Sequence, residues 1–371
     1  MKVYLRKGHH SVYDDLIAHP PEGIDYTLPT VTRGSRVGVV DVLKKKAFRV
    51  YTETLNKPHA IYVNPGGASL IHACSGIMIK NRFPWVIDSE HVSSFVGFQE
   101  GRLEKRRASI EKLLSSPYCK KIMPWSQAGM QSIANGLDTT GFKDKIEVVY
   151  PAIMPAEFKR KKHDGTNLLF VSVRFFTKGG KELLAAYDIL REKHDVSLTI
   201  VSDVPDYLKN KYREDKNVKF LKPDIPREKI LSDIYASADL LVVPSYMDTF
   251  GMVFLEAMAA GLPIVTTDIF AIPEIVGQSG VMLRAPISYY NDRQLIDVER
   301  WNEWKAFESA CEKMRFPEFE KQLALSIAGI IDDARARKAF AASGRRSVET
   351  TFSVDRRNRQ LKRIYEEALK S

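Results

Sequence analysis

The amino-acid sequence predicts an α/β protein of two domains, each built on a largely parallel β-sheet. Its 371 residues exceed the size at which a single hydrophobic core stops growing. In the C-terminal half, short apolar β-branched runs alternate with helical patterns, which is typical of a parallel sheet with helices on both faces. Residues 152–166 are rich in Pro, Lys and Gly and are therefore interpreted as an exposed linker, with the boundary near residue 155.

The predicted elements follow this order along the chain. Strands are expected at 1–7, 36–42, 47–53, 60–66, 85–91, 119–126 and 146–152 in the N-terminal half, with helices at 75–81 and 102–114. In the C-terminal half we expect strands at 167–174, 197–203, 239–245, 262–268 and 280–284, with a helix at 181–193. After residue 285 the strand rhythm stops, and the patterns at 299–314, 320–340 and 352–370 indicate helices.

Charge and composition limit the classes of protein. Hydrophobic residues at 44% and charged residues at 27% are ordinary for a globular protein. A net charge of +10 favours polyanionic partners, but the basic runs at 159–162 and 356–363 contain no aromatic residues, so no nucleic-acid partner is expected. A weaker hypothesis is that 101–114 forms a basic amphipathic helix in peripheral contact with an anionic membrane.

The sequence contains no pattern for secretion, membrane spanning or disulfide formation. It lacks a signal peptide and any uninterrupted apolar run of about 18 residues. The three cysteines, Cys74, Cys119 and Cys311, are far apart and form no C-x-x-C pair, which argues against a disulfide framework and a zinc site. We therefore expect a cytoplasmic protein, peripheral to the membrane at most.

The segment 244–265, PSYMDTFGMVFLEAMAAGLPIV, predicts a turn, a buried helix and a strand. Every residue of the helix 252–260 except Glu256 is apolar, so this carboxylate needs a partner. The helix begins at the sheet edge where open α/β sheets bind ligands, and its first main-chain N–H groups predict an anion site at Phe250, Gly251 and Met252.

Two acidic side chains of this segment, Asp248 and Glu256, favour a ligand that also carries hydroxyl groups. A carboxylate accepts two hydrogen bonds from a vicinal diol, such as that of a sugar or a ribose. The residues alone leave a structural alternative open, in which Asp248 or Thr249 caps the helix and Glu256 pairs with a Lys or Arg from another layer.

Three further elements contribute candidate site residues. In VSVRFFTKGG (171–180), Arg174 and Lys178 follow a strand and are suited to bind a diphosphate, although such residues are often merely solvated. His91 ends the strand at 85–91, and Gly8 lies in the loop after the first strand, where backbone amides could meet a phosphate. No D-x-D motif follows a strand, so no metal site is expected.

Three segments resemble one known family. PSYMDTFGMVFLEAMAAGLP is similar to the signature of the retaining GT-B glycosyltransferases of family 4, also called glycosyl transferases group 1. VSVRFFTKGG looks like the R-x-x-x-K-G element of that family, and residues 348–369 are similar to its closing helix. The N-terminal half resembles the family only in layout, apart from 84–91, which is similar to the strand whose terminal His lies beside the donor sugar.

The resemblance implies a GT-B fold, with two Rossmann-like α/β domains facing across a cleft. Residues 1–155 would form the acceptor-side domain, 156–345 the nucleotide-sugar-binding domain, and 346–371 a C-terminal helix that crosses back to the N-terminal domain. The implied activity is carbohydrate biosynthesis by a hexosyltransferase. It would transfer a sugar, with retention and without metal or cofactor, from a UDP- or GDP-linked donor to a saccharide or lipid-linked acceptor.

By position, the resemblance also implies roles for single residues. Glu256 would hold the ribose, Asp248 would contact the donor sugar, and Arg174 and Lys178 would bind the diphosphate, while His91 would lie beside the sugar. The amides of 250–252 would assist in donor binding, and Gly8 would face the phosphates.

The sequence departs from the family pattern at four places. Asp248 stands where the family usually has Glu, Phe270 and Ala271 replace glycines, the first loop keeps only Gly8, and 285–330 is longer than usual. Two other functions remain as alternatives, a nucleotide-sugar 2-epimerase on the same scaffold and a basic nucleic-acid-binding protein. The nucleobase, the sugar and the acceptor are not indicated by the sequence.

Overall fold

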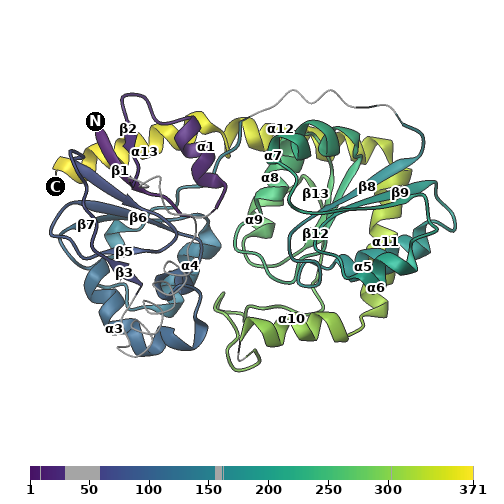
Figure 1. Cartoon of the computed structure of the whole chain (residues 1–371), viewed down its shortest axis with the longest axis horizontal. Coiled ribbons are helices and arrows are strands. Elements are labelled where there is room, and N and C mark those ends of the chain that lie inside the picture. The colour runs from purple at the N-terminus through teal and green to yellow at the C-terminus, as the bar shows by residue number, and fades with distance from the viewer. Residues whose placement is uncertain (9, 30–58, 155–160, 162, 302, 371) are drawn as a thin grey trace, which may run out of the picture. The chain divides into compact units, whose positions relative to one another are not determined.

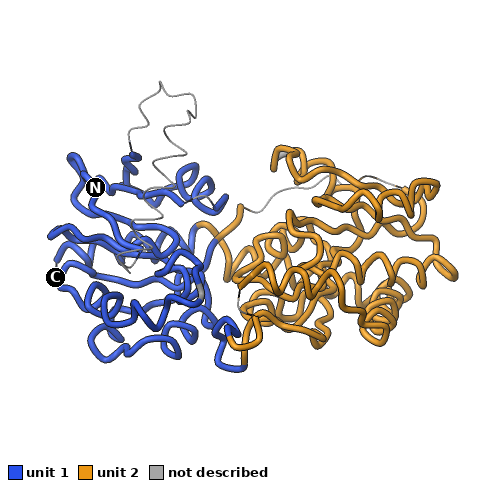
Figure 2. The backbone as a smooth tube through the Cα atoms, turned by 60° about the horizontal axis from the view of Figure 1, so that its bottom comes forward, with its two compact units in different colours: residues 1–151, 292–298, 355–371 blue, residues 152–291, 299–354 orange. Residues whose placement is uncertain are grey.

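The computed structural model describes the whole chain except residues 9, 30–58, 155–160, 162, 302 and 371. The chain divides into two compact units (Figures 1 and 2). Unit 1 comprises Met1–Pro151, Asp292–Val298 and Asp355–Ser371, and unit 2 comprises Ala152–Asn291 and Glu299–Val354. The C-terminal segment thus folds with the N-terminal unit, and so does the short segment at 292–298. The strands predicted at 36–42 and 47–53 lie outside the described residues.

Unit 1 contains a five-stranded parallel sheet in the order β2-β1-β4-β6-β7. Its strands are β1 (Lys2–Arg6), β2 (Asp25–Thr27), β4 (Leu70–Ala73), β6 (Trp85–Ser89) and β7 (Cys119–Pro124). A separate pair consists of β3 (Ala60–Ile61) and β5 (Met78–Ile79). The central strands β4 and β6 are buried throughout, as expected for strands covered on both faces.

Helices cover the sheet of unit 1 on both faces. They are α1 (Val12–Ala18), α3 (Leu103–Leu114), α4 (Gln127–Gly136) and α13 (Val354–Lys370), with short 3-10 turns at Val92–Val96, Glu100–Arg102 and Lys143–Lys145. In α3, the helix proposed to touch a membrane, Ile110 and Leu114 are fully buried and belong to the core of the unit. The apolar side of α3 therefore packs inside the protein, which leaves only an electrostatic contact with lipid.

Unit 2 contains a six-stranded parallel sheet in the order β10-β9-β8-β11-β12-β13. Its strands are β8 (Thr166–Val171), β9 (Val196–Val201), β10 (Val218–Leu221), β11 (Leu240–Val243), β12 (Ile264–Thr267) and β13 (Gly280–Leu283). This is the doubly wound order of Rossmann-like domains, and it reverses between β8 and β11. The carboxyl ends of these two neighbouring strands define the position at which such sheets bind ligands.

The helices of unit 2 form a layer on each face of this sheet (Figure 1). They are α5 (Gly180–Leu190), α6 (Asp206–Lys211), α7 (Arg227–Lys229), α8 (Met252–Ala259), α9 (Ile272–Val276), α10 (Trp304–Lys313), α11 (Pro317–Asp332) and α12 (Ala334–Thr350). A π-helical turn at Ile230–Ile234 and a 3-10 turn at Tyr235–Ser237 follow α7. Helix α5 packs against α11, and α8 packs against α12.

The structure corrects several predicted elements. Residues 75–81 form a turn and strand β5 rather than a helix, because Met78 pairs with Ala60. The expected strand at 146–152 is reduced to an isolated bridge between Ile146 and Ile122. The helix predicted at 320–340 is divided at Asp333, whose carboxylate accepts hydrogen bonds from the first amides of α12. Among the described residues, no helix is long and apolar enough to cross a membrane.

The fold predicts opposite effects for two Gly→Ala substitutions. Gly179 has φ 73°, and a Cβ there would lie 2.3 Å from the Pro244 carbonyl oxygen. Gly179→Ala therefore forces apart the loops that follow β8 and β11. We expect a loss of about 1 to 3 kcal/mol in the free energy of unfolding. Gly329 is exposed in α11 with no atom near its missing Cβ, so Gly329→Ala should gain about 0.5 to 1 kcal/mol. Chemical denaturation checks both, and equal stability of the two variants would contradict this account.

Candidate active site

The candidate site lies at the carboxyl ends of β8 and β11, where the strand order of unit 2 reverses. Lys178 follows β8 and Asp248 follows β11, and their side chains form an ion pair with 2.6 Å between Nζ and Oδ2. The two side chains are 14% and 11% exposed, so the pair is largely shielded from water. The structure thus brings together two residues for which the sequence predicted separate contacts with a donor.

Main-chain contacts hold the two loops together around the pair. The Tyr246 amide donates to the Thr177 carbonyl oxygen at 2.9 Å, and Lys178 also donates to the Met247 carbonyl oxygen. Burial lowers the pKa of the Lys178 ammonium, Asp248 opposes that shift, and the nearby Arg174 adds to it. Two cations and one carboxylate therefore occupy the same sheet edge.

Arg174 is exposed, and its guanidinium lies 4.6 Å from the ring centroid of Trp304. A cation held over an aromatic face keeps its N–H groups at the ring edge available to an anion. Trp304 is the first residue of α10, within the segment 285–330 that is longer than usual for the family that the sequence resembles. The basic residue was predicted for this site, but its aromatic support was not.

The start of α8 differs from the prediction in its capping. Gly251 is the N-cap in a left-handed conformation with φ 82°, and neither Asp248 nor Thr249 caps the helix. The Phe250 amide instead donates to Asp248 Oδ1 at 3.3 Å. A Cβ at Gly251 would meet the Phe254 ring at 2.5 Å, so this glycine is required by the turn itself. The side chains of Phe250 and Met252 are buried, so any contact of these two residues with a ligand would be through the main chain.

Glu256 has protein partners on both carboxylate oxygens. Arg227 Nε lies 2.7 Å from Oε1, and the Tyr235 hydroxyl donates to Oε2 at 3.1 Å. Burial, followed by the charge of Glu256, raises the pKa of Tyr235 well above its ordinary value, so the phenol stays a donor. The ion pair of Glu256 with an Arg, which the sequence left open as a structural alternative, is therefore present, although Arg227 lies on α7 in the same helical layer as α8. Neither Arg227 nor Tyr235 was identified as a site residue from the sequence.

His91 belongs to unit 1, where it is the N-cap of the turn Val92–Val96 and is 1% exposed. Its Nδ1 accepts from the Ser93 amide at 3.1 Å, and its Nε2 lies 2.8 Å from the Gln294 carbonyl oxygen, to which it donates. Burial lowers the pKa of His91 to about 4, opposed by the bond to Gln294. His91 is thus a neutral imidazole with both ring nitrogens engaged.

Gly8, also in unit 1, is required by close packing. A Cβ there would lie 2.4 Å from Ser75 Oγ and 2.7 Å from the Tyr13 ring. The glycine therefore lets the loop after β1 approach the loop after β4. Its predicted phosphate contact stays a prediction.

One group of described side chains could in principle hold a metal, namely His72, Cys74 and Asp88 of unit 1. Hydrogen bonds already engage both ring nitrogens of His72, with Tyr365 and Asp88, and both oxygens of Asp88, with Tyr13 and His72. Burial raises the pKa of the Cys74 thiol well above its ordinary value, which opposes the thiolate that a metal needs. These residues fit a buried hydrogen-bond network better than a metal centre.

Comparison with protein families matches residues 165–290 to the model described as Glycosyl transferases group 1. An uncharacterized glycosyltransferase of Methanocaldococcus jannaschii is 29% identical over 230 residues, 57% of this chain and 56% of that protein. A D-inositol 3-phosphate glycosyltransferase of Corynebacterium efficiens is 38% identical over 71 residues, 19% of this chain and 16% of that protein. The chain thus spans about half, or less, of the length of these relatives.

Two solved structures resemble the chain over nearly its full length. Sucrose-phosphate synthase from Thermosynechococcus elongatus has a TM-score of 0.67 at 16% identity, covering 99% of this chain and 98% of that one. Anabaena HepE in complex with UDP and glucose has a TM-score of 0.62 at 14% identity, covering 98% and 99%. These similarities confirm the fold class that the sequence predicted.

The Glu256 contacts predict a stability cost for Glu256→Gln. Removing the charge leaves the Arg227 guanidinium without its carboxylate, so the free energy of unfolding should fall by about 1 to 3 kcal/mol. The matched control is Glu349→Gln, on the exposed side of α12 in the same unit. Melting curves of both variants give the comparison, and an unchanged midpoint for Glu256→Gln would show that the pair contributes nothing.

The burial of His91 predicts acid sensitivity. The unfolded chain takes up a proton near pH 6.5, whereas folded His91 does so near pH 4, so stability is lost as the pH falls through this range. The loss is on the order of 3 kcal/mol. Imidazole NMR should show His91 neutral above about pH 5, and His91→Gln should flatten this part of the stability profile. An imidazole that titrates near pH 6.5 would overturn the assignment.

Proposed function

We propose that this chain transfers a sugar from a nucleotide-diphosphate-sugar donor to an acceptor hydroxyl. Its residues 165–290 match the family model of the glycosyl transferases group 1. The observation that carries the proposal is the Lys178–Asp248 ion pair at the reversal point of a doubly wound sheet. There a cation for phosphate and a carboxylate for sugar hydroxyls lie within hydrogen-bond distance of each other. When the donor binds, Lys178 would leave Asp248 and contact the diphosphate, and Asp248 would contact the hydroxyl groups of the sugar.

The cations supply the chemistry that the departing diphosphate needs. Lys178 is held in place by the Met247 carbonyl oxygen, and Arg174 is supported by Trp304. Fixed positive charges in a shielded site stabilise the negative charge that develops on a leaving phosphate. With two such cations at the sheet edge, we propose transfer without a divalent metal and without a further cofactor.

The carboxylates bind the neutral parts of the donor. Asp248 would accept hydrogen bonds from the transferred sugar once the diphosphate draws Lys178 away. Glu256 has about four acceptor sites on its two oxygens, so a ribose diol can share the carboxylate with Arg227 and Tyr235. Retention at the anomeric carbon is proposed from the resemblance to the retaining family.

A UDP-linked hexose is our first choice of donor. The reason is that one structure of HepE, whose fold resembles that of this chain, is of its complex with UDP-glucose. A GDP-linked donor remains the second choice. We propose a saccharide or lipid-linked acceptor and a cytoplasmic location, with the net charge of +10 favouring peripheral contact with anionic lipid.

Turnover with a panel of nucleotide sugars tests this proposal. Product formation should survive EDTA, and Lys178→Met should lower kcat/KM by roughly tenfold to more than a hundredfold, the value of one hydrogen bond to a charged group. The control is Lys216→Met, an exposed lysine of the same unit, which should keep full activity. A magnesium-reversible loss in EDTA would contradict metal independence, and a fully active, folded Lys178→Met would contradict the site.

A further inference from the structure

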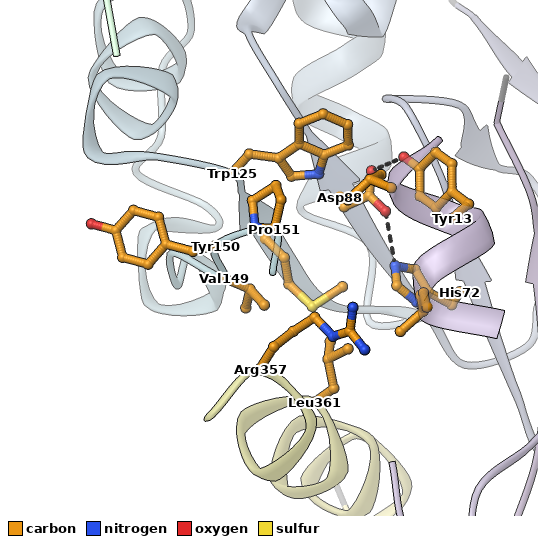
Figure 3. A pocket seen from close by; sticks show the side chains of 12 residues that line it. Tyr13, His72, Asp88, Trp125, Val149, Tyr150, Pro151, Arg357 and Leu361 are labelled. Atoms are coloured by element: carbon orange, nitrogen blue, oxygen red, sulfur yellow. Dashed lines mark hydrogen bonds and ion pairs between the residues drawn. The ribbon is translucent and has the colours of Figure 1, made fainter. Parts of the chain in front are cut away.

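A cavity lies within unit 1, on the face of its sheet that α1 and α13 cover (Figure 3). Its volume is about 40 Å³, and its lining includes Trp125, Tyr150, Asp88 and Arg357. About 10 to 15 Å³ suffices for one water molecule, so the cavity has room for a small polyatomic group but not for a whole sugar. None of the residues proposed to bind the donor lines it.

Arg357 is the unusual residue of this cavity. It lies near the start of α13 and is 5% exposed. Its Nη2 donates to the His19 carbonyl oxygen at 2.9 Å and to Asn358 Oδ1 at 2.8 Å, while its Nε donates to the same Asn358 oxygen. Its Nη1 is buried and has no hydrogen-bond partner among the residues that the structure describes. All the acceptors that it contacts are therefore neutral.

Among the described residues, the buried Arg357 guanidinium makes no hydrogen bond to a carboxylate, and Asp15 attracts it only without direct contact. Burial lowers the pKa of Arg357, opposed by Tyr26, Tyr365 and Asp15, but a guanidinium remains charged in proteins at neutral pH. A buried charge that is only partly compensated is costly, whereas an oxyanion that accepts hydrogen bonds from the planar guanidinium offsets much of that cost. An anion beside Nη1 of Arg357 would therefore be favoured.

The rest of the cavity restricts where an anion can lie. Asp88 faces the same cavity, and its oxygens already accept from Tyr13, from His72 and from the Ser75 amide. Its negative charge repels an anion, so the favoured position is on the side of α13. In Figure 3 Arg357 projects from that helix into the cavity that Asp88, Tyr13 and His72 also line. The first turn of a helix also favours negative charge.

We propose that this cavity binds a single oxyanion group, a phosphate or a carboxylate, through Nη1 of Arg357. The group is a free ion or the acidic end of a larger molecule whose remainder stays outside the cavity. Because the residues involved belong to unit 1 alone, the site can exist whether or not the proposed transfer reaction is correct.

The test uses thermal melting with inorganic phosphate at constant ionic strength. It is done in a Lys178→Met background, so that the proposed diphosphate site does not contribute. Phosphate should raise the melting temperature in a saturable way, and adding Arg357→Met, which keeps an apolar stem, should abolish the shift. The matched control is Arg359→Met, an exposed arginine of the same helix, which should leave the shift intact. An equal shift with and without Arg357 would overturn the proposal.

Two further measurements test the proposal without relying on the Arg357→Met variant. Arg357→Lys keeps the charge but loses the fork, so phosphate affinity should fall by roughly tenfold or more. Crystals of the unaltered protein soaked in arsenate, a phosphate analogue, should show an anomalous peak beside Arg357, and its absence at saturating arsenate would also overturn the proposal.

Other probes identify the source of the oxyanion. Protection by glucose 6-phosphate that depends on Arg357 would identify the phosphoryl group of a larger molecule. Protection by inorganic phosphate alone would identify the free ion, and protection by acetate alone would identify a carboxylate. Protection by none of the three would count against the site.

Discussion

The ion pair between Lys178 and Asp248 is the interaction on which the rest of the site depends. Its two members come from neighbouring strands at the point where the order of the sheet reverses, and both are mostly shielded from water. A buried ion pair contributes little net stability, because the cost of removing two charges from water offsets their attraction. The loops that carry the pair are already joined through Tyr246 and Thr177, so the charges are not needed to connect them. A role in ligand binding therefore explains the buried Lys178–Asp248 pair better than a role in protein stability.

Glu256 shows how the fold tolerates a carboxylate in an apolar helix. Arg227 and Tyr235 satisfy it from the segment after β10, so α8 can be buried without a ligand. The same contacts fix the carboxylate in one orientation before any donor arrives, which lowers the entropy lost on binding. The structural and the functional interpretations of this residue are therefore compatible rather than exclusive.

The sequence predicted the parts of the fold that local pattern determines. Strands such as β11 and β12 are β-branched and buried on both faces, and their apolar runs identify them. In contrast, β10 was missed because its four residues include the exposed Lys219 and no strong run. The segment 75–81 was misassigned because its apolar residues fit a helix as well as a strand, and only pairing with β3 decides between them.

The contacts among the predicted site residues could be anticipated only in part. Lys178 and Asp248 both lie in loops that follow strands of one parallel sheet, and such loops meet at the same edge of the sheet. The partners of Glu256 could not be anticipated, since Arg227 lies 29 residues away along the chain and no periodic pattern connects them. The stacking of Trp304 on Arg174 spans 130 residues, and such contacts depend on tertiary packing alone.

The central claim is that the ion pair between Lys178 and Asp248 separates when the donor binds. The most direct test is calorimetric titration of nucleoside diphosphate into the single and double variants of these residues. Asp248→Asn frees Lys178 from its carboxylate, so nucleoside diphosphate should bind at least as tightly as in the unaltered protein. Lys178→Met should weaken binding by roughly tenfold or more, with or without Asp248→Asn. Equal weakening by both single substitutions, with no further loss in the double variant, would contradict the account, because it would show that the intact pair is the binding element.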